Sequence, residues 1–151
     1  MKKVNLLFLL GLFSIMTFSF SACSDDDEIS NASELLGLWE PVHAEGYETF
    51  DGEKRTWNED VDAASNYADY NRVEFLDDGI YNSYYYSDGW KLYISGSGTY
   101  QLKGKKVHVS SEDEAYEITV VSLTSTQMIL EAKESWEGEE FYEKVTYARV
   151  N

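Results

Sequence analysis

Short aromatic and β-branched runs, separated by Gly, Asp and Asn, fill the chain from residue 34 onward. Runs of this kind are typical of β-strands bounded by turns. The expected strands are Leu36–Ala44, Tyr47–Trp57, Tyr70–Asp77, Ile80–Ser87, Ser97–Leu102, Lys105–Ser110, Ala115–Ser122, Gln127–Ser135 and Glu140–Val150. Because nearly every connection is too short for a crossover, strands that are adjacent in sequence are expected to pair in antiparallel order.

The connections and the alternation of side chains favour one architecture. Asp78-Gly79 and Lys103-Gly104 are typical of two-residue hairpin turns, and Glu137-Gly138 predicts a looser one. Val73 and Phe75 alternate with polar neighbours, so one face of the sheet is expected to be buried. The sequence therefore predicts an all-β, antiparallel up-and-down barrel of eight or nine strands, because closure removes both sheet edges. An open two-sheet sandwich is the alternative.

One segment does not follow the strand pattern, and the size of the chain allows only one folded unit. Residues 58–70 are acidic and contain alanine, which fits a short helix or a long loop. The chain has 151 residues, and 34–151 is enough for a single core. We expect one domain.

The N-terminus has the pattern of a secretory signal. Lys2 and Lys3 precede an uncharged, mostly apolar run at Leu6–Phe20, which is too short for a typical spanning helix. We therefore expect residues 1–22 to be a signal peptide, with an uncleaved membrane anchor as the alternative. Ser21-Ala22-Cys23 follows, and Cys23 is the only cysteine in the chain. This ending resembles the lipobox of bacterial lipoproteins, which implies lipidation of Cys23.

An acidic tether is expected after this cysteine. Residues 24–28 read Ser-Asp-Asp-Asp-Glu, and such a run stays solvated. We assign 23–33 to a lipidated, acidic tether. The run also resembles the acidic surface-export signal of Bacteroidetes lipoproteins. That resemblance implies a lipid-anchored protein of the outer membrane that faces the cell exterior.

Charge and cysteine usage exclude several classes of function. Loss of Lys2 and Lys3 with the signal peptide changes the net charge from −16 to −18. A nucleic-acid partner is disfavoured, because binding to phosphates needs clustered Lys and Arg. A single cysteine excludes an internal disulfide, and with two histidines it leaves no ordinary zinc cluster.

The two ends of the folded part carry a family resemblance. Leu35-Leu36-Gly37-Leu38-Trp39 opens the first strand, and Thr146-Tyr147-Ala148-Arg149-Val150 closes the last. These segments resemble the signature of the lipocalins and the broader calycin group. The resemblance implies that Gly37 allows a close turn, that Trp39 plugs the barrel floor, and that Arg149 stacks on the indole.

Three further segments resemble the lipocalin-like domains of Bacteroidetes lipoproteins. They are residues 73–81, 98–102 and 123–130. The Thr-Asp-Tyr element that lipocalins carry mid-chain is absent from the sequence, so the resemblance does not specify the ligand.

Aromatic side chains are the candidates for ligand binding. Because side chains alternate between the two faces of a strand, Tyr81 and Tyr85 are expected on the same face as Phe75. With Tyr100 and Met128 they would line a cavity that holds a small apolar or amphipathic molecule or a glycan. The alternative is that these residues fill a closed core or cover a sheet surface. Four more aromatic residues fall in or near connections, where they would contact a sugar or protein, or pack over one end of the barrel: Trp57, Tyr67, Trp90 and Trp136.

Catalytic and cofactor signatures are absent from the sequence. His43 and His108 lie far apart, and His108 is expected on the wet face of its strand. No nucleophile elbow, phosphate loop, zinc-protease motif or calcium loop occurs. We therefore expect a non-enzymatic binding protein without catalytic residues, metal or cofactor. The second hypothesis is an acidic interaction module that binds a basic protein, for example as an inhibitor of lysozyme.

Overall fold

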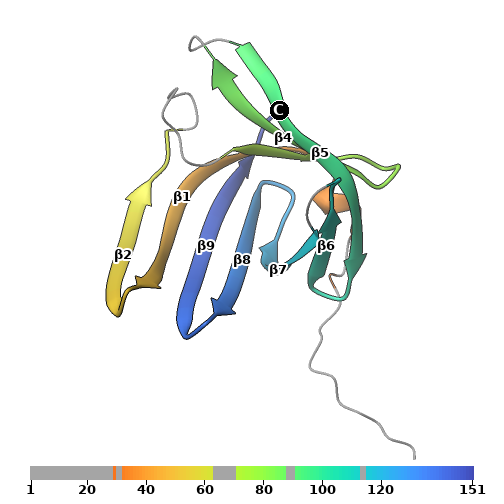
Figure 1. Ribbon diagram of the computed structural model, residues 1–151. Coiled ribbons are helices and arrows are strands. Elements are labelled where there is room, and N and C mark those ends of the chain that lie inside the picture. Colours follow the sequence, from red (N-terminus) through yellow and green to blue (C-terminus); the bar gives the residue numbers. More distant parts are fainter. Residues whose placement is uncertain (1–28, 30–31, 63–70, 88–90, 113–114) are drawn as a thin grey trace, which may run out of the picture.

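A single antiparallel sheet of nine strands makes up the folded part of the chain (Figure 1). The computed structural model describes residues 29, 32–62, 71–87, 91–112 and 115–151. The signal segment, Cys23, most of the tether, Tyr67 and Trp90 lie outside these residues. The elements are the 3-10 helix η1 (Ala32–Leu35) and strands β1 (Gly37–Phe50), β2 (Glu53–Asp60), β3 (Arg72–Phe75), β4 (Ile80–Ser87), β5 (Lys91–Lys103), β6 (Lys106–Ser110), β7 (Ala115–Leu123), β8 (Gln127–Trp136) and β9 (Glu139–Arg149).

The sheet closes on itself through its first and last strands. β1 pairs with β9 from Trp39↔Arg149 to Glu48↔Phe141, with a bulge between Pro41 and His43. Strands β1 and β3 to β9 form the closed barrel, and β2 is an extra strand. The predicted up-and-down barrel is confirmed, and the two-sheet sandwich is wrong, because the β1–β9 pairing leaves no second layer.

Among the described residues, no helix has the length and apolar character to cross a membrane.

The other edge of β1 is shared between two short strands. Gly37–Trp39 of β1 pair with β3, whereas His43–Phe50 pair with β2. β3 in turn pairs with β4 only as far as Arg72↔Tyr84. Tyr85 and the rest of β4 therefore extend beyond β3, and no pairing between β4 and β2 occurs among the described strands. The barrel is consequently split at this end.

Two hairpins project from the split end. In Figure 1, β1–β2 and β8–β9 extend together at the lower left, away from the crossing strands β4 and β5. Their tips are joined: the Asp51 N–H donates to Glu139 Oε1 over 3.0 Å, and the Glu140 N–H donates to Thr49 Oγ1 over 2.6 Å. We call this end of the barrel the mouth, and the opposite end, which holds η1 and the C-terminus, the floor.

The tips of these hairpins differ from the sequence expectation. Asp51 and Gly52 have φ values of 52° and 78°, and Glu137 and Gly138 have values of 50° and 91°. Positive φ at two successive residues is the geometry of a tight hairpin turn. The expected strand across Tyr47–Trp57 was therefore wrong, because it turns at Asp51-Gly52, and the turn at Glu137-Gly138 is tight instead of loose.

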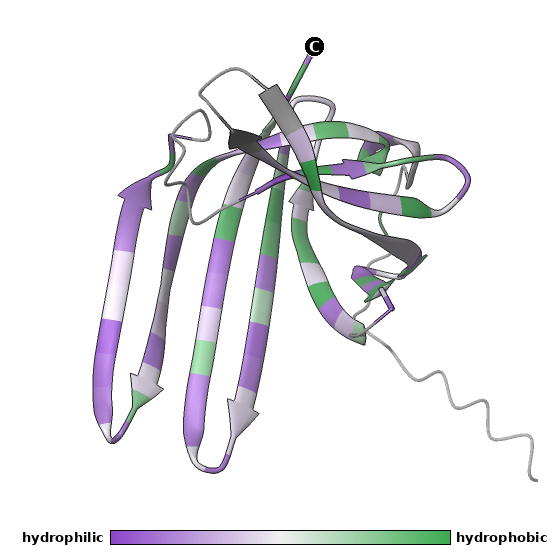
Figure 2. Ribbon diagram, turned by 45° about the horizontal axis from the view of Figure 1, so that its top comes forward, coloured by the Kyte–Doolittle hydropathy of each residue, from purple (hydrophilic) through white to green (hydrophobic). Residues whose placement is uncertain are grey.

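The apolar core lies between the floor and the middle of the barrel. Trp39, Phe75, Leu35 and Met128 are among its largest fully buried side chains, and Val107 and Val109 pack with them. Figure 2 shows most of the green, hydrophobic bands in the part of the barrel away from the projecting hairpins, whereas the hairpins are mainly purple and white. The core therefore closes the floor and does not extend to the mouth.

Candidate functional site

The floor is sealed by one indole and one guanidinium. Trp39 is fully buried and donates its indole N–H to the Leu35 carbonyl over 2.8 Å. The guanidinium carbon of Arg149 lies 4.2 Å from the centroid of this indole. Gly37 has φ +115°, and a Cβ on it would lie 2.8 Å from Arg149 Nη1. The three residues of the predicted signature thus meet at one point, where they close the barrel.

Three of the predicted ligand residues form an aromatic cluster above this floor. The rings of Phe75 and Tyr100 meet edge to face with centroids 5.0 Å apart, and the centroid of Tyr81 lies 5.6 Å from that of Phe75. The Tyr100 hydroxyl donates to the Leu76 carbonyl over 2.8 Å. Met128 is completely buried nearby in the same core. Phe75, Tyr100 and Met128 therefore fill the lower barrel, which matches the alternative expectation of a closed core.

Further tyrosines point into the barrel beside this cluster: Tyr81 is the register partner of Phe75, and Tyr147 is the register partner of Met128. Burial raises the pKa of Tyr81 above its usual value, and the neighbouring hydroxyl of Tyr116 adds to this rise. The nearby Tyr147, which is 8% exposed, also raises the pKa of Tyr81. Sequence reasoning missed Tyr116 and Tyr147, although both follow the inward alternation of Val120 and Val145. These tyrosines give the barrel interior hydroxyl groups among its apolar side chains.

Tyr85 does not join the inner cluster, which corrects the sequence expectation. Its ring is 46% exposed and stacks on Tyr93 across the β4–β5 pair, with centroids 5.9 Å apart. Tyr85 keeps the parity of Tyr81, but it lies beyond the end of β3. The alternation of side chains along a strand predicts which face of the sheet Tyr85 occupies. It does not predict whether a neighbouring strand covers that face.

The projecting hairpins carry a second set of aromatic rings on their inner side. Trp57 packs against Phe141 with ring centroids 6.0 Å apart. Gly46 lies beneath Trp57, since a Cβ at Gly46 would come within 2.6 Å of the indole. Phe50 is 57% exposed and Trp136 is 49% exposed at the tips. Two of the tryptophans assigned to connections, Trp57 and Trp136, thus belong to strands.

We call this inner side the mouth face. It continues the buried faces of Ala44, Leu130 and Val145 by strand alternation. Its residues are Gly46, Glu48, Phe50, Glu53, Arg55, Trp57, Ala132, Glu134, Trp136, Glu139, Phe141 and Glu143. Phe141 was missed by the sequence analysis, although its spacing of four from Val145 places it on the same face.

Two polar atoms of the mouth face are buried without a hydrogen bond among the described residues. They are Nε1 of Trp57 and Oε2 of Glu139. A buried donor or acceptor without a partner costs about 1–3 kcal/mol.

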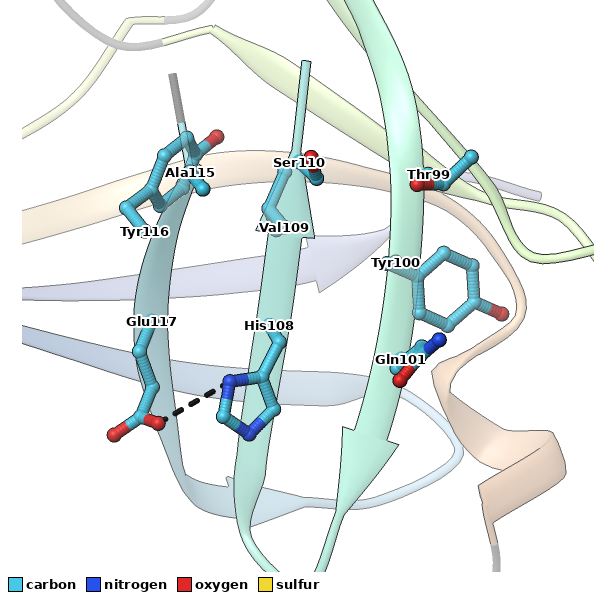
Figure 3. A pocket seen from close by; sticks show the side chains of 9 residues that line it. All are labelled: Thr99, Tyr100, Gln101, His108, Val109, Ser110, Ala115, Tyr116 and Glu117. Carbon is cyan, nitrogen blue, oxygen red and sulfur yellow. Dashed lines mark ion pairs between the residues drawn. The ribbon is translucent and has the colours of Figure 1, made fainter.

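A hollow of about 440 Å³ also lies along β5, β6 and β7 (Figure 3). Most of its lining side chains lie on the outer, solvent-facing side of these strands, including Gln101, His108 and Glu117. Glu117 lies 2.6 Å from Lys106 Nζ and 3.3 Å from His108 Nδ1. The hydrogen bond from Lys106 lowers the pKa of Glu117. Lys106 and His108 thus both contact the partly exposed carboxylate of Glu117.

A smaller hollow of about 260 Å³ lies at the floor, between η1 and Leu102.

His43, at the other end of the molecule, pairs with the exposed Asp60 at 2.9 Å. Within the part of the chain that the structure describes, no three His, Cys, Asp or Glu side chains gather closely enough to hold a metal ion.

A family model described as a lipocalin-like domain matches residues 35–130. This range begins at Leu35, two residues before Gly37 of the signature, and ends at the inward-facing Leu130 of β8. The chain belongs to the lipocalin-like domain family. The match confirms the predicted resemblance to lipocalin-like domains; it includes the Gly37–Trp39 segment and ends before Arg149. A comparison with curated proteins gives no significant match.

Solved structures share the fold of this lipocalin-like domain. Lobster apocrustacyanin A1 is 14% identical with a TM-score of 0.50, and apocrustacyanin C1 is 12% identical with a TM-score of 0.52. Each comparison covers 80% of this chain and 63% of the other, so the lipocalin-like protein spans less than two thirds of those chains. Bovine odorant-binding protein in complex with undecanal is 19% identical, with a TM-score of 0.43, over 80% of this chain and 74% of that one.

Proposed function

We propose that this lipocalin-like protein binds a small apolar or amphipathic molecule at the mouth face and catalyses no reaction. The observation that carries the proposal is the pair of half-exposed rings of Phe50 and Trp136 above a sealed floor. Large exposed aromatic side chains that gather on one face are typical of binding sites.

Tryptophan fluorescence tests this proposal on the mature chain. Titration with dodecyl maltoside, below its micelle concentration, is expected to change the emission because Trp57 and Trp136 lie in the site. Trp136→Ala is expected to weaken binding, whereas Val121→Ala, an exposed apolar position outside the mouth face, serves as the matched control. Absence of any saturable change, with no bound molecule in native mass spectrometry, would count against the proposal.

A glycan is the second ligand class for the same face. Flat sugar faces stack on exposed aromatic rings such as those of Phe50 and Trp136. A thermal-shift comparison of oligosaccharides with alkyl chains that lack a sugar separates the two classes. Stabilisation by the oligosaccharides alone would assign the site to glycans.

We also propose that Cys23 carries a lipid and anchors the domain to the outer membrane, facing the exterior. The proposal is supported by the apolar run before Cys23 and the acidic residues after it. Metabolic labelling with a fatty acid is expected to mark the wild-type chain but not Cys23→Ser. Digestion of intact cells with a protease is expected to remove the domain. Protection of the domain would contradict the surface location.

An acidic interaction module remains the second candidate function. It is favoured by the net charge of −18 after loss of the signal peptide, because complementary charge accelerates association. Lysozyme is the basic test partner. Binding that weakens with salt, together with inhibition of lysozyme, would support this function, and binding that persists at high salt would contradict it.

A further inference from the structure

The two sides of the projecting hairpins differ sharply in charge. On the outer side, Lys54 lies 3.6 Å from the Tyr47 ring centroid, Lys133 pairs with Glu131 at 2.7 Å, and Lys144 pairs with Glu45. Four acids lie on the same side as those three lysines, Glu45, Glu131, Glu140 and, beside His43, Asp60. The mouth face carries five glutamates and a single basic residue, Arg55. Strand alternation has therefore placed the negative charge on the inner side.

The acids of the mouth face alternate with its aromatic rings. Strand register sets Arg55, Glu48, Phe141 and Glu134 in one row across the four strands. The next row toward the core holds Trp57, Gly46, Glu143 and Ala132, and the hairpin tips hold Phe50, Glu53, Glu139 and Trp136. Phe50, Trp136 and Phe141 thus each have carboxylates as neighbours along the strand and across the pair, whereas the mouth-face neighbours of Trp57 are Gly46 and Arg55.

This pattern distinguishes between polar head groups. The faces of aromatic rings attract ammonium groups, and nearby carboxylates add to the attraction. An anionic head at the same place would meet five carboxylates and one guanidinium, which itself lies 3.7 Å from Glu48. The apolar tail of a ligand would lie over Trp57 and Phe141, toward the buried Val145.

We propose that the mouth face selects a cationic amphiphile, an ammonium or quaternary ammonium group on an apolar chain. This inference rests on the proposed function, because it names the chemical class of the ligand for the same site. The observations that carry it are the exposed aromatic rings and the acidic charge that is complementary to the head group.

Three probes with the same number of carbons in the chain test the inference on the mature protein. They are dodecyltrimethylammonium, dodecyl maltoside and dodecanoate, each below its micelle concentration. At low salt the cationic probe is expected to bind about tenfold more tightly than the neutral probe, and dodecanoate most weakly. The preference is expected to shrink as salt screens the exposed carboxylates.

Paired variants separate local from overall charge. Glu48→Gln with Glu134→Gln removes two acids from the mouth face, and Glu140→Gln with Glu112→Gln removes two exposed acids outside it. The first pair is expected to reduce the preference for the cation at least threefold, whereas the second leaves it unchanged. Circular dichroism and melting curves check that both variants fold.

The outcomes distinguish this inference from the proposed function. If the neutral probe binds and the cation has no advantage, the inference is overturned and the proposed function stands. If no probe binds, the proposed function itself fails. If poly-lysine binds in a salt-dependent way while dodecyltrimethylammonium does not, the face serves a basic protein and the small-ligand inference is overturned.

Discussion

The Arg149 guanidinium stacks on the Trp39 indole and also donates hydrogen bonds to three backbone carbonyls. Its Nε donates to the Ser125 carbonyl over 2.6 Å, and its Nη1 donates to the Leu36 carbonyl over 2.6 Å. A third N–H donates to the carbonyl of Glu34. One side chain of the last strand thus joins the start of β1, the end of η1 and the β7–β8 turn, so the floor depends on its planar shape.

Arg149→Lys is expected to lower the free energy of unfolding by about 2 kcal/mol. Lysine keeps the charge but cannot supply several coplanar donors and a stacking surface at once. Urea denaturation measures the effect. Arg55→Lys, whose side chain is 67% exposed, is the control and is expected to change stability by less than about 0.5 kcal/mol. Equal effects at the two positions would contradict a special role for Arg149.

Gly37→Ala is expected to destabilise the protein more than Gly52→Ala. Both glycines have positive φ, 115° and 78°, so each substitution strains the backbone by about 1 kcal/mol or more. A Cβ at Gly37 would additionally meet Arg149 Nη1, whereas a Cβ at Gly52 meets nothing within 4 Å. Melting temperatures of the two variants isolate the steric part, and an equal loss would show that Arg149 moves aside freely.

Trp57→Phe is expected to keep or slightly raise the stability of the free protein. Phenylalanine retains a ring against Phe141 and removes the buried Nε1 donor that has no partner. Trp57→Ala removes the ring as well, and we expect it to cost about 2–3 kcal/mol. Chemical denaturation of both variants gives the comparison. A loss in Trp57→Phe as large as in Trp57→Ala would mean that the indole N–H is satisfied.

Tyr81→Phe is expected to make the protein less sensitive to alkali. Burial raises the pKa of Tyr81 in the native state, so above about pH 10 the unfolded chain loses this proton first. The unfolded state then binds fewer protons than the native state, and stability falls as the pH rises. Unfolding measured between pH 8 and 11 is expected to show a shallower decline for Tyr81→Phe. Val121→Ala, at an exposed position without a titratable group, is the control and should retain the wild-type decline.

Local patterns in the sequence were sufficient to locate most strands. β4 has the predicted limits, and β6 and β8 differ from the prediction by one residue at one end. Alternation also placed His108 on the wet side, where it faces Glu117. These features depend on neighbours within a few residues, and turn chemistry and period two report on such neighbours directly.

The candidate site was predicted less well because it depends on pairing over long distances. The sequence analysis selected Tyr100 and Met128, which the fold uses to fill the core, and Tyr85, which extends past its neighbouring strand. It omitted Phe141, which becomes significant only when β9 is aligned with β1 and Trp57 is brought over Gly46. Such contacts depend on register between distant strands, which the sequence pattern alone does not specify.

The sequence by itself determined that the chain is an all-β meander, because turn residues and the alternation of side chains are local signals. It also determined the residues that seal the floor, because the Gly37–Trp39 segment and the Arg149 segment together resemble a known signature. Only the tertiary structure decided that β2 separates from β3 and β4 and leaves an aromatic, acidic face at the mouth. The physical reason is that alternation fixes which side of a strand a residue occupies. What lies opposite that side is set by how the whole sheet closes.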